Sequence, residues 1–137
     1  MWWVYALLSA FFASLTAIFA KLGIVNISTN LATGIRTIVI LLLVWSIVLF
    51  RGEAQEISSL SRQNVLFLVI SGIATGLSWL FYFKALQMGN VSQVATIDKL
   101  SVALTIVLSI LFLGETLTLK TAIGAFLIIA GTLVLIF

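Results

Sequence analysis

The sequence predicts an all-α membrane protein, a bundle of five transmembrane helices with very little chain outside the bilayer. Hydrophobic residues make up 63% of its 137 positions and charged residues only 8%, whereas a soluble domain usually carries about 25% charged residues. The mean hydropathy is +1.32. Seven Lys/Arg and four Asp/Glu side chains cannot cover the surface of a water-soluble domain of this size, so most of the surface must face lipid.

A transmembrane helix needs roughly 20 mostly apolar residues, and the chain begins with two such runs. The first is predicted at about residues 2–20, and the polar stretch 26–30 separates it from the second, at about residues 31–50. Because no basic residue precedes the first run, we interpret it as a retained transmembrane helix rather than a signal peptide. Residues 51–64 are predicted to be the only sizeable aqueous loop, which is too short to form a domain.

Three further apolar runs follow this loop. The third helix is predicted at about residues 65–86, before a Gly89-Asn90 turn, the fourth at about 91–113 and the fifth at about 117–137. Strands are disfavoured, because the strands of a membrane barrel are segments of about ten residues in which apolar and polar positions alternate. These runs are continuous and longer. We therefore expect residues 1–137 to form a single transmembrane domain.

The composition also disfavours several kinds of function. With no cysteine and no histidine, the chain lacks the residues for disulfides, thiol nucleophiles and imidazole catalysis. Its basic residues are dispersed among apolar runs and make no patch for nucleic acid. The acidic residues and lysines suggest no nucleophile–base pair or metal-ligand set. The sequence therefore predicts no enzyme activity, no cofactor or metal, and no nucleic-acid partner.

The basic residues divide almost evenly between the two sides of the membrane. Three fall near the side of the N-terminus (Arg51, Arg62, Lys120) and four nearer the other side (Lys21, Arg36, Lys84, Lys99). Orientation normally follows an excess of Lys and Arg in cytoplasmic loops. Two interpretations stay open: either the four belong to the spans, so that the N-terminal side is cytoplasmic, or the chain inserts both ways and pairs as an antiparallel homodimer. Such a dimer would reproduce the inverted repeats of many transporters.

Ionisable residues inside a membrane are costly, so each one is a candidate functional residue. At about 1.5 Å per helical residue, Lys84 lies about 8 Å before the Gly89-Asn90 turn and Asp98 about 12 Å after it. These depths predict an ion pair, which could serve the substrate or only bridge two helices. Lys99 should point about 100° away from Asp98 on a regular helix, but Asp98 could serve both lysines if the helix is irregular there.

The same side of the predicted bundle holds four cations and one carboxylate, which favours a substrate with an anionic group. Arg36 lies deeper than Lys21 and is the better candidate to bind it. For Lys21, we expect the side chain to snorkel to the lipid headgroups. Beside these charges, Trp79, Tyr82 and Phe83 could form an aromatic wall of the kind that binds small amphipathic molecules, or they could belong to an interfacial aromatic belt.

Polar side chains recur at helical spacing in the third and fourth predicted helices. Each of the two helices carries one such stripe (Ser71, Thr75, Ser78, Tyr82; and Asp98, Ser101, Thr105, Ser109). The stripes should face the bundle interior, to line a binding site or simply to pack helices. The predicted substrate-binding residues are Arg36, Trp79, Tyr82, Lys84, Asp98, Lys99, Ser101 and Thr105.

Taken in order, these landmarks resemble the EamA domain of the drug/metabolite transporter superfamily. The resemblance covers nearly the whole chain and rests on an ordered set of features: Arg36, the aromatic-rich run 78–86, the stretch Ile97-Asp98-Lys99-Leu100-Ser101, Leu113-Gly114-Glu115, and Gly124 through Gly131. In one departure, Thr96 stands where members of this family commonly have a proline, and the chain has no proline at all. A kink in the fourth helix would then depend on Thr96 bonding back to a carbonyl one turn earlier.

The resemblance implies a multi-pass transporter of the cell membrane that moves metabolites, amino acids, sugar derivatives or drugs by alternating access. Larger relatives have ten helices, arranged as two inverted five-helix repeats around a central cavity. This chain resembles one repeat, which favours a homodimer, with small-molecule substrate and lipid as its other partners. The alternative is a non-transporting membrane subunit, or a half-transporter that requires a different partner chain.

Overall fold

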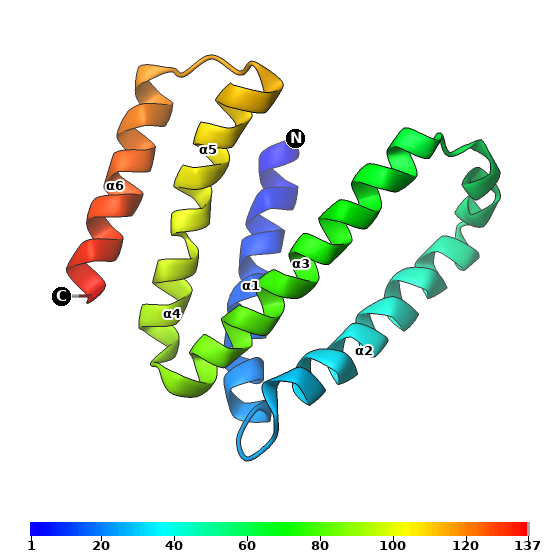
Figure 1. Cartoon of the computed structure of the whole chain (residues 1–137), viewed down its shortest axis with the longest axis horizontal. Helices are drawn as coiled ribbons and strands as arrows, with labels where there is room; N and C mark the ends of the chain where they lie inside the picture. The colour runs from blue at the N-terminus through cyan, green and yellow to red at the C-terminus, as the bar shows by residue number, and fades with distance from the viewer. Residues whose placement is uncertain (137) are drawn as a thin grey trace. The chain divides into compact units, whose positions relative to one another are not determined.

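The structure is a computed structural model that describes residues 1–136, so the predicted end of the fifth helix at Phe137 lies outside the described residues. Its elements are α1 (Trp2–Gly23), α2 (Thr29–Phe50), the short 3-10 helix η1 (Glu53–Ser59), α3 (Arg62–Met88), α4 (Val91–Asp98), α5 (Leu100–Leu113) and α6 (Leu119–Ile136) (Figure 1). Within this part of the chain, five helical stretches are long and apolar enough to cross a membrane, with α4 and α5 together forming one of them. The predicted all-α membrane fold with five spans is confirmed.

The chain forms two compact units, which are described separately. The α2–α3 unit comprises residues Phe19–Gln87, and the α4–α6 unit comprises Met1–Ile18 together with the chain from Met88 onward. In the α2–α3 unit, Ser28 caps α2 by accepting a hydrogen bond from the backbone N–H of Leu31 at 3.2 Å, which satisfies one of the free donors of a helix start. Gly52, at φ +70°, turns the chain from α2 into η1, a conformation that glycine adopts without strain.

One end of the α2–α3 unit is tied together by two polar side chains, which we call the clamp. Lys21, in the last turn of α1, donates to the backbone carbonyl of Leu86, and Gln87 donates to the carbonyl of Ile27 at 3.0 Å. A cation at the last carbonyls of α3 also complements the helix dipole. Lys21 is thus half-buried and hydrogen-bonded within the protein, which differs from the expectation that it snorkels to the headgroups.

The best-packed part of this unit lies at the clamp. Its buried apolar side chains come from the end of α1 and the residue after it, the start of α2 and the end of α3: Ala20, Ile24, Ala32, Phe83 and Leu86. Farther along α2 and α3, toward η1, most apolar side chains are exposed, as lipid-facing residues are in a membrane protein. The unit is therefore closed at one end and loosely packed along the rest of its length.

In the α4–α6 unit, α6 runs alongside α5 and α4 (Figure 1). Gly114 ends α5 at φ +69°, the left-handed conformation common at helix C-termini. Thr118 caps the start of α6, since its hydroxyl oxygen accepts from the N–H of Thr121 at 3.2 Å.

The predicted fourth helix is interrupted at Lys99, which separates α4 from α5. Here the N–H of Lys99 bonds to the carbonyl of Thr96, and the N–H of Val102 to that of Lys99, both at 3.0 Å. These are the tighter three-residue bonds typical of a 3-10 turn. The hydroxyl of Thr96 bonds back to the carbonyl of Ser92 at 2.6 Å, so the interaction expected of Thr96 in place of a proline is present.

A side chain from α6 supports this interruption. Thr132 is 1% exposed; its hydroxyl donates to the carbonyl of Ile128 at 2.8 Å and also lies 3.4 Å from the carbonyl of Thr96. The Thr96 carbonyl therefore accepts from the N–H of Lys99 and lies within reach of the Thr132 hydroxyl, whose single proton is better placed for the nearer Ile128 carbonyl.

Candidate functional site

The strongest concentration of binding groups lies between α2 and α3, around Arg36. The guanidinium carbon of Arg36 lies 4.3 Å from the ring centroid of Phe83 and 5.5 Å from that of Trp79. These two aromatic residues are four positions apart and share one face of α3. Tyr82 packs edge-on against Phe83 at 5.8 Å and is near enough to Arg36 to interact with it electrostatically. The rings stabilise the cation through their π faces.

The guanidinium retains an unused donor. Its Nη1 atom is buried and has no hydrogen-bond partner among the described residues, and a charged group without one is costly to bury. The acidic residues of the α2–α3 unit, Glu53 and Glu56, both lie in η1, outside its transmembrane helices. Arg36 is therefore a cation whose counter-charge this unit does not supply within its spans.

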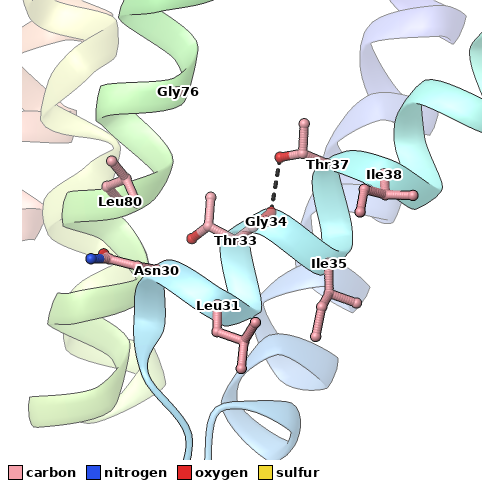
Figure 2. Close-up of a pocket in the computed structure, with 9 residues that line it drawn as sticks. All are labelled: Asn30, Leu31, Thr33, Gly34, Ile35, Thr37, Ile38, Gly76 and Leu80. Atoms are coloured by element: carbon pink, nitrogen blue, oxygen red, sulfur yellow. Dashed lines mark hydrogen bonds between the residues drawn. The ribbon is translucent and has the colours of Figure 1, made fainter.

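An open cavity of about 630 Å³ lies between α2 and α3, near this cluster in the chain. Figure 2 shows its lining, which comes mostly from α2 and otherwise from two residues of α3: Asn30, Leu31, Thr33, Gly34, Ile35, Thr37, Ile38, Gly76 and Leu80. Gly76 and Leu80 lie on the α3 face that carries Trp79 and Phe83, because residues three and four apart on a helix are neighbours. Arg36 itself does not line the cavity, but its neighbours Ile35 and Thr37 do; we call the cavity and the Arg36 cluster together the α2–α3 site.

Three of the predicted binding residues come together in the α2–α3 site: Arg36, Trp79 and Tyr82. Phe83 is closer to the guanidinium than Trp79 is, yet it was left out of the predicted set despite its four-residue spacing from Trp79. The cavity residues Thr33 and Thr37 were also missed. Their spacing around Arg36 on one helix was the available signal.

Lys84, also predicted, lies in α3 as an exposed residue. Its expected partner, Asp98, belongs to the other unit, so the Lys84–Asp98 ion pair stays a prediction.

The other predicted residues lie in the α4–α6 unit. Asp98 and Lys99 flank the helix interruption, and the Lys99 Nζ lies 3.7 Å from the Asp98 Oδ2, with both side chains substantially exposed. The expectation that Lys99 points away from Asp98, which assumed a regular helix, is therefore wrong. The helix is irregular at this position, and the two side chains lie close together. Thr105 donates to the carbonyl of Ser101 at 2.8 Å. Within residues 1–136, no group of three His, Cys, Asp or Glu residues is placed to hold a metal ion.

Comparison with known proteins gives the following relatives. The EamA-like transporter family matches over residues 1–137. A Sinorhizobium protein described as an uncharacterized transporter in the cobO 3' region is 48% identical over 134 residues, which cover 98% of this chain and 95% of that protein. An uncharacterized protein of Methanocaldococcus jannaschii is 39% identical over 77 residues, 56% of each chain. No solved structure matches significantly.

Proposed function

Because this chain belongs to the EamA-like transporter family and has five candidate membrane spans within residues 1–136, we propose that it carries small organic anions across the cell membrane by alternating access. The observation that supports this most directly is the buried Nη1 of Arg36, held against two aromatic rings beside a cavity. Arginine presents a planar fork of donors suited to carboxylates, sulfonates and phosphates. An anionic substrate would complete the arrangement.

Alternating access is consistent with how the α2–α3 unit is packed. The clamp closes one end through hydrogen bonds from side chains to main-chain carbonyls, while the rest of α2 and α3 is loosely packed. Few contacts would have to break for that end to open. Gating of this kind, around a fixed central site, is how transporters with inverted repeats work.

We further propose that the working unit is a homodimer, in which the second chain supplies the second repeat. Asp98 and Lys99 are exposed well inside a predicted span, where contact with lipid would be costly. A partner chain or a water-filled pathway shared with it would provide a polar environment. Lys84, Asp98, Lys99, Ser101 and Thr105 stay proposed substrate-binding residues of this working unit.

The flux test uses a probe that cannot cross lipid by itself. Hexanesulfonate stays ionised at neutral pH, so proteoliposomes containing only this purified chain should take it up faster than protein-free liposomes. Arg36→Gln should abolish the uptake, whereas Arg51→Gln, which changes an exposed arginine paired with Glu53 outside the spans, should preserve it. Uptake equal in wild type and Arg36→Gln would contradict the proposal. Uptake that requires a second, different chain would instead indicate a half-transporter.

The dimer is tested separately, with orientation reporters fused to the C-terminus. Signal from both sides of the membrane would support an antiparallel homodimer. One fixed orientation would rule out the antiparallel arrangement but leave a parallel dimer, which cross-linking of the purified protein would detect.

A further inference from the structure

We infer that the α2–α3 site selects hydroxylated organic acids, in which a hydroxyl neighbours the carboxylate, over amino acids of the same size; this names the substrate class of the proposed function and rests on it. The inference comes from the direction in which each polar group of the cavity can hydrogen-bond. Three observations carry it: the state of two threonine hydroxyls, the donor on Arg36, and the charges of the unit.

Thr33 and Thr37 have already used their hydroxyl protons. Thr33 donates to the carbonyl of Thr29, and Thr37 donates to the carbonyl of Thr33, both at 2.8 Å; the second bond is drawn in Figure 2. A hydroxyl has one proton and two acceptor lone pairs. Since both protons are committed to the backbone, the two hydroxyl oxygens can offer a ligand in the cavity only acceptors.

Arg36 has the opposite character, because a guanidinium donates and cannot accept. The α2–α3 site thus presents donors at Arg36 and acceptors one helical turn or less away on α2. A ligand that satisfies both carries an anionic acceptor and, close to it, a hydrogen-bond donor. The apolar side chains of Leu31, Ile35, Ile38 and Leu80 suit the remaining hydrocarbon part of such a molecule.

The donor is better supplied by a hydroxyl than by an ammonium group. The charged residues within the helices of the α2–α3 unit are all basic (Lys21, Arg36, Arg62, Lys84), and its two carboxylates lie in η1. An ammonium beside Arg36 would meet a like charge and no carboxylate of this unit, in surroundings where desolvation already disfavours charge. A neutral hydroxyl makes the same hydrogen bond without that cost.

Three probes of equal chain length separate these possibilities: caproate, α-hydroxycaproate and norleucine. Their binding to the full-length protein, purified in detergent at neutral pH, is measured by calorimetry. We expect α-hydroxycaproate to bind about fivefold more tightly than caproate, because one neutral hydrogen bond contributes about 1 kcal/mol, and norleucine to bind more weakly than caproate.

Variants assign the preference to the two hydroxyls. In Thr33→Val/Thr37→Val, the ratio of α-hydroxycaproate affinity to caproate affinity should fall from about five to about one. Thr37→Ser keeps a hydroxyl and should keep the preference. The matched control is Thr75→Val, which removes an exposed hydroxyl on α3 that also bonds back to its own helix, at 2.9 Å from the carbonyl of Ser71, but lies outside the cavity lining.

The outcomes are distinguishable. Equal binding of caproate and α-hydroxycaproate, or tightest binding of norleucine, would overturn the inference and leave the proposed anion site intact. A preference that survives in the double valine variant would also overturn it. If none of the three probes binds, both the inference and the proposed site fall.

Discussion

One buried polar group in each unit shows a contrast between the two units. In the α4–α6 unit, the buried Thr132 hydroxyl lies near two main-chain carbonyls. In the α2–α3 unit, the buried Nη1 of Arg36 has no partner among the described residues. Satisfied polar groups in a membrane support the helices around them, whereas an unsatisfied charged donor is costly and is typically retained for a ligand. The contrast separates a region built for support from one built for binding.

The largest predicted effect concerns the clamp that closes the α2–α3 unit. Lys21→Met should lower the free energy of unfolding, measured in mixed detergent micelles, by about 1.5–3 kcal/mol, because it leaves the buried end of α3 without a charge-assisted hydrogen bond. Lys120→Met, at an exposed position at the start of α6, is the control and should have little effect. If both variants lose equal stability, the clamp does not hold this end of the unit.

The second effect tests whether Arg36 binds through its geometry or only through its charge. Arg36→Lys keeps the charge but replaces a planar fork of donors with a point charge. Uptake of hexanesulfonate by proteoliposomes should fall about tenfold, which corresponds to about 1.4 kcal/mol, with little change in unfolding free energy. Unchanged uptake would show that a positive charge at this position is sufficient.

A smaller effect is expected at Thr132, in the α4–α6 unit. Thr132→Val removes the hydroxyl and keeps the volume, and it should lower the free energy of unfolding by about 0.6 kcal/mol, the average for hydrogen bonds between membrane helices. Hydrogen exchange should rise at residues 99–102, around the interruption. Thr105→Val removes an exposed hydroxyl in the same unit and should change less. If exchange at the interruption stays the same, Thr132 does not brace it.

The smallest effect concerns the ion pair that the sequence predicts for Lys84 and Asp98. If the two residues pair, each single variant, Lys84→Ala or Asp98→Ala, should lose more unfolding free energy than the double variant does. The coupling energy should be about 0.5 kcal/mol or more. Additive losses, measured by the same unfolding assay, would mean that the two residues act separately.

The sequence predicted the five spans well because lipid imposes a strong condition: every span must be long, continuous and apolar. It also singled out Arg36, Trp79 and Tyr82, since a deep cation and amphipathic aromatics are unusual in such a setting. Their function as substrate-binding residues stays a prediction.

The helix interruption at Lys99 could be predicted only as one of two alternatives, a regular or an irregular fourth helix. No proline or glycine marks it, and the Thr132 hydroxyl that supports it lies 36 residues away in the chain. The acceptor character of Thr33 and Thr37 was likewise hidden, because it depends on which backbone carbonyl each hydroxyl reaches. Sequence spacing shows where a side chain lies on a helix but does not show where its proton goes.

The most direct test of the central claim, that Arg36 is a cation awaiting an anionic substrate, is calorimetric titration of the purified protein with hexanesulfonate. The account predicts saturable binding to wild type and to Arg51→Gln, and none to Arg36→Gln, with all three proteins monodisperse in detergent. Binding of equal strength to Arg36→Gln would contradict it.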